Sequence, residues 1–250
     1  MKTSVIIPAR YNSSRLPGKV IMKICEKPII WWVYQQVRKS RILEQVFIAA
    51  DDFRVIEVCN EYSIPSIMTK STHESHLDRL HEVSESIASD LYVCVCADEP
   101  LVKAATIEKV LPQQNETDEF IARTLMRELQ DPAETIDPSN LKLITDKDDY
   151  AILITRGVLP YPYKSTQFHY KKVVGIECYN KEALDFFANT SSGNLEKIEG
   201  TNLLRFIEYR KPLKCIMTDD YQLSIDTAND FEKVSKIMTE MLENGDLQIP

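Results

Sequence analysis

The chain has 250 residues, 44% of them hydrophobic, which is enough for one large domain or for a domain with a subdomain. Its formal net charge of -8 argues against a general nucleic-acid-binding protein, because such proteins are usually basic. No apolar run approaches the roughly 18 residues of a membrane span, and no signal-peptide pattern precedes the first predicted strand. We therefore expect a cytoplasmic protein without a membrane segment.

The first predicted strand, residues 5–7, is a short apolar run that leads into a loop rich in positive charge. Pro8 ends the run, and Arg10, Arg15 and Lys19 follow it. Arginine offers forked donors and lysine a compact charge, and both neutralise phosphate oxygens. A basic surface loop is the alternative interpretation. Three cations so close to the end of the first strand favour a polyphosphate site.

The rest of the chain alternates between segments with helical and strand patterns. The sequence predicts helices at residues 28–37, 53–62, 80–88, 181–189, within 193–209 and at 228–244. It predicts strands at residues 45–50, 64–68, 91–97, 120–125, 141–145, 151–155, 173–179 and 214–217. Strands that alternate with helices indicate βαβ units and a parallel sheet with right-handed crossovers. We predict one α/β domain over residues 1–250, with an insertion.

Several acidic and histidine residues have to be judged between capping, structural and metal-binding roles. Asp51 and Asp52 follow the strand 45–50, and we favour Asp52 as a helix cap. His73 and His76 have no further ligands at zinc spacing, so we do not favour a zinc site there. Asp98 follows the strand 91–97, and ligands of parallel sheets lie beyond the carboxyl ends of strands. Asp98 and the cationic loop should therefore face one crevice.

The six cysteines are scattered along the chain: Cys25, Cys59, Cys94, Cys96, Cys178 and Cys215. They form no CxxC pair and have no histidine at zinc spacing, so we expect reduced thiols that pack as small hydrophobic residues. Cys94 and Cys96 would share one face of their strand.

The motifs, taken in chain order, resemble those of the 3-deoxy-manno-octulosonate cytidylyltransferases (CMP-Kdo synthetases). The segments that carry the resemblance are Pro8-Ala9-Arg10-Tyr11-Asn12-Ser13-Ser14-Arg15-Leu16-Pro17-Gly18-Lys19, His73-Glu74-Ser75 with Asp78-Arg79-Leu80, Asp98-Glu99-Pro100, Tyr150-Ala151 through Arg156 and Pro160, and Asp226-Thr227. They span almost the whole chain, and the N-terminal motif is highly specific. A more distant likeness extends to the wider sugar nucleotidyltransferases.

The resemblance implies a fold, a reaction and an assembly. The fold would be that of the nucleotide-diphospho-sugar transferases, Rossmann-like, with a mostly parallel central sheet and an inserted acceptor and dimerisation subdomain at about residues 155–212. The reaction would transfer CMP from CTP to a sugar acid and release pyrophosphate, with Mg²⁺ as cofactor. The enzyme would be a homodimer that serves lipopolysaccharide, capsule or another surface glycan.

The resemblance also implies roles for individual residues. Arg10, Arg15 and Lys19 would hold the triphosphate, and Lys19, Arg10 and Asp98 would be the catalytic residues. Asp98 and Asp226 would hold Mg²⁺, with helix capping as the alternative for each. The remaining nucleotide-binding residues would be Pro8, Ala9, Ser75, Arg79 and Ala97.

The acceptor side departs from the family pattern. The family's SGT is Ser75-His76-Leu77 here, and its QGDEP is Cys96-Ala97-Asp98-Glu99-Pro100. Its KHxGIY, whose histidine contacts the sugar acid, has Val173 at the histidine position. Its EKLEQLR helix loses an acid and an amide in residues 199–205. Polar groups that pair with sugar hydroxyls discriminate strongly between substrates, so we expect an acceptor other than Kdo.

The new acceptor would be contacted by residues on the altered side, each of which could equally be structural. These are Arg156, Lys172, Glu177, Glu199 and Asn202. Two alternatives remain at this point: an enzyme of the same fold that uses another nucleoside triphosphate, and a nucleotide-binding regulatory protein without catalysis. The presence of the loop cations and of Asp98 and Asp226 argues against the second.

Overall fold

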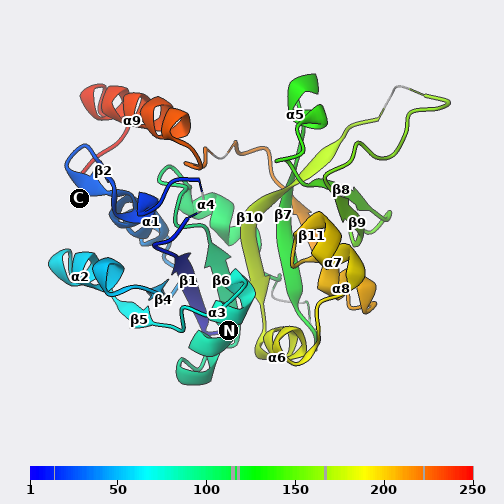
Figure 1. Cartoon of the computed structure of the whole chain (residues 1–250), viewed down its shortest axis with the longest axis horizontal. Helices are drawn as coiled ribbons and strands as arrows, with labels where there is room; N and C mark the ends of the chain where they lie inside the picture. The colour runs from blue at the N-terminus through cyan, green and yellow to red at the C-terminus, as the bar shows by residue number, and fades with distance from the viewer. Residues whose placement is uncertain (14, 114–115, 117–118, 166–167, 222, 250) are drawn as a thin grey trace.

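A computed structural model of the chain describes all residues except 14, 114–115, 117–118, 166–167, 222 and 250 (Figure 1). Ser14 of the N-terminal motif therefore lies outside the described residues. The elements, in chain order, are β1 (Thr3–Ala9), the 3-10 helix η1 (Lys19–Ile21), β2 (Lys23–Ile24), β3 (Lys27–Pro28), α1 (Ile29–Val37), β4 (Gln45–Ala50), α2 (Phe53–Glu61), β5 (Ser66–Met68), α3 (His76–Ser86), β6 (Leu91–Val95), α4 (Ala104–Glu108), β7 (Ala122–Glu128), α5 (Pro132–Ile136), β8 (Lys142–Thr145), β9 (Ala151–Thr155), β10 (Lys171–Tyr179), α6 (Lys181–Asn189), α7 (Asn194–Glu199), α8 (Leu204–Glu208), β11 (Lys214–Met217) and α9 (Ala228–Glu243). Strands alternate with helices through the first half, which confirms the predicted α/β class.

Within the described residues, nine strands form one sheet in the order β11-β7-β10-β6-β1-β4-β5, with β8 paired to β10 and β9 to β8. β1 lies between two parallel neighbours, β4 and β6, as expected for strands that are joined by helical crossovers. The pairs β4–β5 and β7–β11 are also parallel, whereas β10 runs antiparallel to β6, β7 and β8. The predicted mostly parallel central sheet is confirmed, and β10 is the strand that breaks the pattern.

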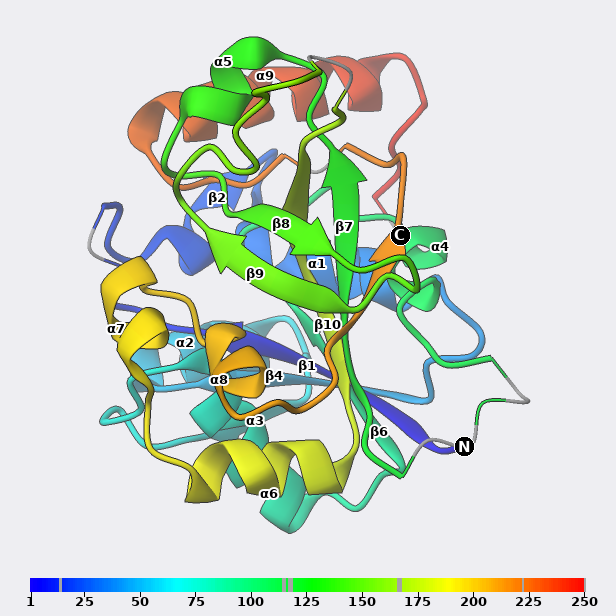
Figure 2. The ribbon, with the colours of Figure 1, turned by 90° about the vertical axis from the view of Figure 1, so that its right-hand side faces the viewer.

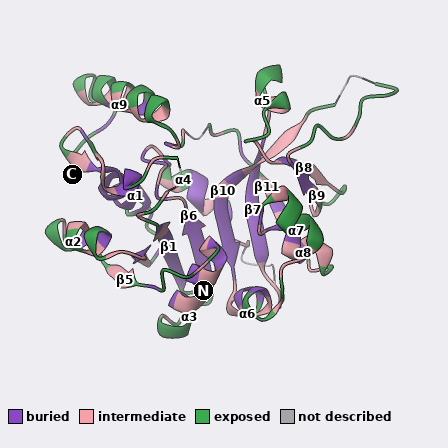
Figure 3. Ribbon diagram, in the orientation of Figure 1, coloured by how far each residue is buried: buried purple, intermediate pink, exposed green. Residues whose placement is uncertain are grey.

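Helices cover both faces of the sheet, which explains the nearly continuous apolar runs of its central strands. In β1, Val5 and Ile7 point into one core and Ile6 into the other. Helices α1, α2, α4 and α9 contribute to the first core, and α3, α6 and α8 contribute to the second. Figure 3 shows the central strands buried and the outer faces of α2, α7 and α9 exposed. Trp31 and Trp32 of α1 belong to the first core, as expected for an aromatic helix that is buried.

Two predicted helices differ from the structure for local reasons. Helix α3 begins at His76, earlier than the predicted start at residue 80, because Ser75 and Asp78 form a capping box. The segment 193–209 is two short helices, α7 and α8, because α7 ends at Gly200 in the left-handed conformation (φ 65°). The early start of α3 matters for the site, since it fixes the direction of the His76 side chain.

Figure 2 shows β8 and β9 nearest the viewer, with α7 and α8 beside them, on the side of the sheet formed by the second half of the chain. Of these elements, α7 and α8 lie within the acceptor and dimerisation subdomain predicted at about residues 155–212, whereas β8 and β9 come before it in the chain. The limits of the subdomain stay a prediction. In the part of the chain that the structure describes, no helix has the length and apolar character to span a membrane.

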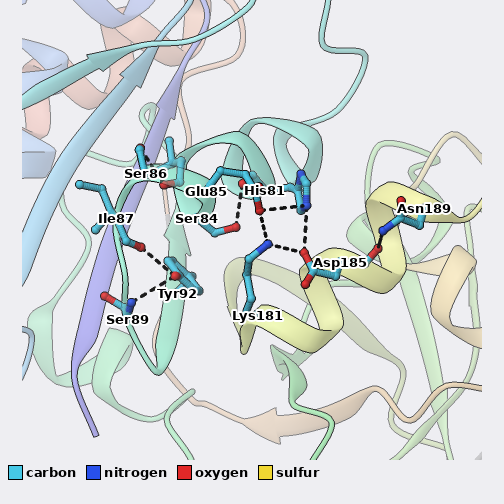
Figure 4. A network of polar contacts seen from close by, with 11 residues as sticks. His81, Ser84, Glu85, Ser86, Ile87, Ser89, Tyr92, Lys181, Asp185 and Asn189 are labelled. Atoms are coloured by element: carbon cyan, nitrogen blue, oxygen red, sulfur yellow. Dashed lines mark hydrogen bonds and ion pairs between the residues drawn. The ribbon is translucent and has the colours of Figure 1, made fainter.

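Helices α3 and α6 lie side by side, and a polar network joins their exposed edges (Figure 4). Lys181 contacts Glu85 and Asp185, and His81 Nε2 lies 3.0 Å from Asp185 Oδ1. Ion pairs at such exposed positions are screened by solvent and contribute little to stability. The buried apolar side chains of the two helices therefore carry most of this interface.

Candidate active site

A cleft of about 600 Å³ lies where the loop after β1, the end of β6, the start of α3 and the middle of β10 meet. Most of the residues singled out from the sequence line it: Pro8, Arg10, Arg15, Lys19, Ser75, Arg79, Ala97, Asp98, Lys172, Glu177, Asn202 and Asp226. The expected meeting of the cationic loop and Asp98 in one crevice is confirmed. Ala9, Arg156 and Glu199 do not line this cleft.

Lys19 lies at the centre of the nucleotide side and is almost completely buried. Its Nζ donates to Asp98 Oδ2, to the Ile225 carbonyl at 2.8 Å and to Asp226 Oδ1 at 3.0 Å. Burial alone would lower the pKa of Lys19, but the Asp98 and Asp226 carboxylates raise it above its usual value. Lys19 is therefore a fixed positive charge in a site with little solvent.

Asp98 and Asp226 are free of the capping roles that were their structural alternative. The helix after β6 is α4, and its N-cap residue is Lys103, not Asp98. The N-cap residue of α9 is Thr227, not Asp226. The capping interpretation is therefore wrong for both carboxylates. It is confirmed for Asp52, whose side chain accepts from the Arg54 amide at the start of α2.

Arg15 contacts the same carboxylate from the solvent side. Its guanidinium lies 2.8 Å from Asp226 Oδ1, with 57% of the side chain exposed. Arg10 is also exposed and lines the cleft at the end of β1. Strand β1 extends through Ala9, whereas the predicted strand ended before Pro8. The loop thus presents one buried cation and two exposed ones to the same cavity.

Arg79 of α3 forms the wall beside the start of the loop. It is fully buried, and its guanidinium contacts Thr69 and lies 3.2 Å from Asp51 Oδ2. Burial lowers the pKa of Arg79, and the Asp51 carboxylate opposes that shift. The other oxygen of Asp51 accepts from the Tyr11 amide at 3.0 Å. Asp51 therefore ties the cationic loop to α3, and Arg79 Nε is buried with no partner among the described residues.

The opposite wall is formed by β10, whose pairing with β7 shifts register between Val174 and Glu177. At Gly175 a Cβ would lie 2.7 Å from Cys96 Sγ, and that thiol donates to the Gly175 carbonyl at 3.3 Å. The position therefore requires glycine because the backbone and the thiol approach each other closely. Val173, Gly175 and Glu177, at alternate positions of β10, all line the cleft.

Two further ionisable groups on this side have shifted pKa values. Lys172 Nζ donates to Asn140 Oδ1 at 2.7 Å, and burial, followed by the charge of Arg127, lowers the pKa of Lys172. Burial and the neighbouring Asp98 carboxylate raise the pKa of Glu99 to about 8. Strongly shifted pKa values cluster at functional sites, because catalytic and binding groups there are buried and lie close to other charges.

Comparison with known proteins assigns the chain to a family. The model of the cytidylyltransferase family matches residues 4–216. The chain belongs to the cytidylyltransferase family. It is 32% identical to the 3-deoxy-manno-octulosonate cytidylyltransferase of Fusobacterium nucleatum, over 96% of this chain and 98% of that protein. It is 31% identical to the Escherichia coli enzyme of the same name, over 98% and 99% of the two chains.

A solved structure of similar sequence agrees with this assignment. A CMP:2-keto-3-deoxy-manno-octonic acid synthetase complexed with CTP superposes with a TM-score of 0.90 and 30% identity, over 96% of this chain and 99% of that one. A glucose-1-phosphate thymidylyltransferase from Bacillus anthracis, 14% identical with a TM-score of 0.69, shares the fold. The protein is a nucleotidyltransferase, and the resemblance expected from the motifs is confirmed.

Arg156 and Glu199 lie behind the cleft of this cytidylyltransferase. Glu199 accepts from Thr155 Oγ1 and from the Arg156 amide, each at 2.7 Å. The Arg156 guanidinium donates to the Glu199 and Pro138 carbonyls, each at 2.8 Å. These contacts join the end of β9 to the end of α7, which leaves the acceptor-contact role of both residues a prediction.

His76 is a cleft residue that was not among the predicted site residues, although it stands in a segment that departs from the family pattern. His76 lines the cleft and contacts Glu177, whereas His73 pairs with Glu82 outside it. The two histidines therefore do not share a metal site. The available signal was the pair His76-Leu77 in a segment that carries small residues in the family. Cys94 and Cys96 also line the cleft as free thiols, although they were predicted only as reduced core residues on one face of their strand.

Proposed function

We propose that this cytidylyltransferase transfers CMP from CTP to a sugar acid or a related acceptor and releases pyrophosphate, in the synthesis of a surface glycan. The observation that carries the proposal is the buried Lys19 ammonium between Asp98 and Asp226, with Arg10 and Arg15 at the mouth of the same cleft. Transfer at phosphorus needs charge neutralisation and in-line positioning more than a covalent nucleophile.

Each loop cation has a role that follows from its burial. Arg10 and Arg15 are exposed and would bind the triphosphate as it enters. Lys19 is fixed and poorly solvated, so it would stabilise the charge that grows on the phosphates during transfer. The Ala9 side chain is buried in the core, so only its backbone would contact the nucleotide, beside Pro8.

The cytidine would lie against the start of α3 and the end of β6. Arg79, held by Asp51, would present its unpartnered Nε–H to this side. Ser75 would act chiefly through its backbone, because its hydroxyl caps α3. Ala97 offers no side chain that could block the base.

The residues present fit a magnesium ion. Asp98 and Asp226 each give one oxygen to the Lys19 ammonium, Oδ2 and Oδ1 respectively, and each keeps a second oxygen that Lys19 does not use. Magnesium prefers such carboxylate oxygens and completes its shell with phosphate oxygens and water. Held by these second oxygens of Asp98 and Asp226, it would offset phosphate charge and acidify the attacking acceptor hydroxyl.

The acceptor would be other than Kdo, because several polar groups of the family pattern are replaced on this side. Lys172, Glu177 and Asn202 line the cleft, and Lys172 and Asn202 would contact the acceptor directly, whereas the largely buried Glu177 would act through its neighbours. Arg156 and Glu199 would act by holding β9 and α7 in place. Apolar side chains such as Val173 would exclude sugars whose hydroxyls need a partner there.

We also propose that the enzyme works in the cytosol as a homodimer formed through the second half of the chain. Tyr161 and Tyr163 project from the segment after β9 with exposures of 77% and 84%, which is unusual for aromatic residues without a partner. Light scattering coupled to size-exclusion chromatography would measure the mass. A monomer at micromolar concentration contradicts the dimer.

Pyrophosphate release with each of the four nucleoside triphosphates, Mg²⁺ and a panel of sugar acids tests the proposed reaction. Of the four nucleoside triphosphates, we expect only CTP to give pyrophosphate release in the presence of an acceptor. Removal of the metal with EDTA should abolish that release. Asp98→Asn should lower kcat by about 10²–10³-fold, since it removes the carboxylate charge that would hold magnesium and that pairs with Lys19 beside the reacting phosphate. Asp246→Asn, at an exposed position, is the control. Turnover of UTP or ATP instead of CTP, or full activity of Asp98→Asn, contradicts the proposal.

A further inference from the structure

One ion pair in the cleft, between His76 and Glu177, is not used by the chemistry described so far. His76 is the first residue of α3, and Glu177 lies in β10. His76 Nε2 is 2.8 Å from Glu177 Oε2, and the Tyr179 hydroxyl donates to the same oxygen at 2.9 Å. Both members of the pair line the cleft.

The two partners are not equally accessible to a ligand. The His76 side chain is 36% exposed and the Glu177 side chain is 7% exposed. A molecule that enters the cleft therefore meets the imidazole, with the carboxylate behind it. Because Nε2 faces Glu177, Nδ1 is the ring nitrogen that remains for a ligand.

The surrounding charges favour the protonated ring. Burial and the charge of Arg10, in the loop after β1, would each lower the pKa of His76. The carboxylates of Glu177 and of Asp78, on the same helix, raise that pKa, and the net shift is above the usual value. Burial would raise the pKa of Glu177, but His76 lowers it below the usual range. Cys94 of β6 is close to both and stays a neutral thiol, since burial raises its pKa. The carboxylates of Glu177 and Asp78 thus favour the protonated form of the ring that faces the cleft.

We propose that His76 determines acceptor specificity by donating its Nδ1–H to an acidic group of the acceptor, with Glu177 as its positioning residue. This inference rests on the proposed cytidylyl transfer. Charge-assisted hydrogen bonds to a carboxylate or a phosphate are short and strong. The N-terminal end of α3 adds partial positive charge at His76, and Lys172 lies in the same cleft. The acceptor is therefore an anionic sugar, either a sugar acid or a sugar phosphate.

Kinetics with paired acceptors test this role. Pyrophosphate release is measured with CTP, Mg²⁺ and pairs of acceptors that consist of a charged sugar and its neutral counterpart. Three sugar acids, 3-deoxy-manno-octulosonate, N-acetylneuraminate and galacturonate, are each compared with their methyl ester. Glucose 1-phosphate is compared with glucose. We expect the wild type to prefer a charged member. His76→Gln should raise KM for that acceptor about 10- to 100-fold, with KM for CTP unchanged within about twofold.

The control and the contradicting results are defined by the same assay. His73→Gln changes a histidine of the same segment that pairs with Glu82 outside the cleft, and it should behave as the wild type. An unchanged acceptor KM in His76→Gln overturns the role of His76. So does a wild-type preference for neutral acceptors, which would leave cytidylyl transfer itself intact.

A second measurement does not depend on turnover. The His76 ring is titrated by NMR in the wild type and in Glu177→Gln, in the presence of CMP, with and without the sugar acid preferred in the kinetic assay or inorganic phosphate. We expect the His76 ring to be protonated at neutral pH in the wild type and to have a lower pKa in Glu177→Gln. One of the two anions should raise the pKa of the ring further, and the anion that does so shows whether the acceptor group is a carboxylate or a phosphate. A neutral ring, or no response to either anion, overturns the inference. Loss of pyrophosphate release with this signature intact would instead refute the proposed function.

Discussion

The cations that follow β1 differ in how they can act, although the sequence places them within one short motif. Lys19 is buried and held by the Ile225 carbonyl as well as by Asp98 and Asp226. Arg15 is more than half exposed and contacts Asp226 from outside. A charge that is fixed where solvent is excluded acts more strongly than one screened by water and salt. The two residues should therefore contribute to different kinetic constants.

We expect Lys19→Met to lower kcat for pyrophosphate release by about 10²–10³-fold, because it removes a preorganised charge at the reacting phosphates. Arg15→Met should mainly raise KM for CTP, by about tenfold or less, since its charge is screened. Steady-state kinetics at two salt concentrations would measure both effects. Lys23→Met, an exposed lysine after η1, is the control. Equal losses of kcat in the two variants would refute the distinction.

At the scale of elements, one arginine holds the short helices of the second half together. Arg205 of α8 makes two hydrogen bonds to the Glu196 carboxylate of α7, at 2.6 and 2.8 Å. It also donates to the Phe187 and Thr190 carbonyls at the end of α6, at 2.9 and 3.0 Å. Both charged side chains are about nine-tenths buried. Helices as short as α7 and α8 depend on such tertiary contacts, because they are too short to be stable alone.

Arg205→Met should lower the free energy of unfolding by about 3–5 kcal/mol, since it leaves the buried Glu196 carboxylate without a partner. The double variant Arg205→Met with Glu196→Leu should recover part of that loss, because no charge is then left unpaired. Urea denaturation followed by circular dichroism would measure both. Lys197→Met, on the exposed face of α7, is the control. A single variant as stable as the wild type would contradict this account.

The sequence predicted elements well where one local pattern decides them. β4, β9, β11 and α6 have the predicted bounds, because continuous apolar or amphipathic runs end at clear polar breaks. The start of α3 was missed although its capping box is present in the sequence as Ser75 and Asp78. The split at Gly200 was missed because a glycine inside a helical pattern does not by itself predict the left-handed conformation.

The site divides in the same way. The cationic loop and Asp98 could be placed in one cleft from strand ends alone, whereas Ser75, Arg79 and Asp226 were assigned from the family resemblance. The contact between His76 and Glu177 could not, because it joins side chains 101 positions apart whose directions depend on a cap and a register shift. The roles of Arg156 and Glu199 also depend on tertiary contacts, which turn both side chains toward β9 and α7.

At the scale of the whole molecule, the chain crosses from β11 back to the first half before it forms α9 (Figure 1). Asp220 anchors the described part of this crossing. Its Oδ2 accepts from Thr106 Oγ1 of α4 at 2.7 Å and from Lys109 Nζ at 2.9 Å. These hydrogen bonds hold the pKa of Asp220 well below its usual range. The anchor lies between the sheet and Asp226, so it supports the position of that carboxylate.

Asp220→Asn should therefore reduce stability in a pH-dependent way. A carboxyl whose pKa is lowered by folding stabilises the fold above its unfolded value of about 3.9, and the effect is lost as the pH falls further. We expect the variant to be less stable by about 1 kcal/mol at neutral pH and the difference to shrink below about pH 4. Thermal unfolding across this range would measure it. Asp219→Asn, the exposed neighbour, is the control, and a pH-independent difference would contradict the prediction.

The hydrogen bond between Lys19 and the Ile225 carbonyl has a consequence for folding during synthesis. The ammonium of Lys19 contacts a carbonyl 206 positions later in the chain, at Ile225. Contacts of such sequence separation form late, because the entropy of closing the intervening loop must be overcome first. During synthesis Lys19 leaves the ribosome long before Ile225, so this contact forms only after the chain has been made through Ile225. The proposed phosphate-binding site is thus completed late in folding, and we expect a chain that ends before Ile225 to be unable to act on CTP.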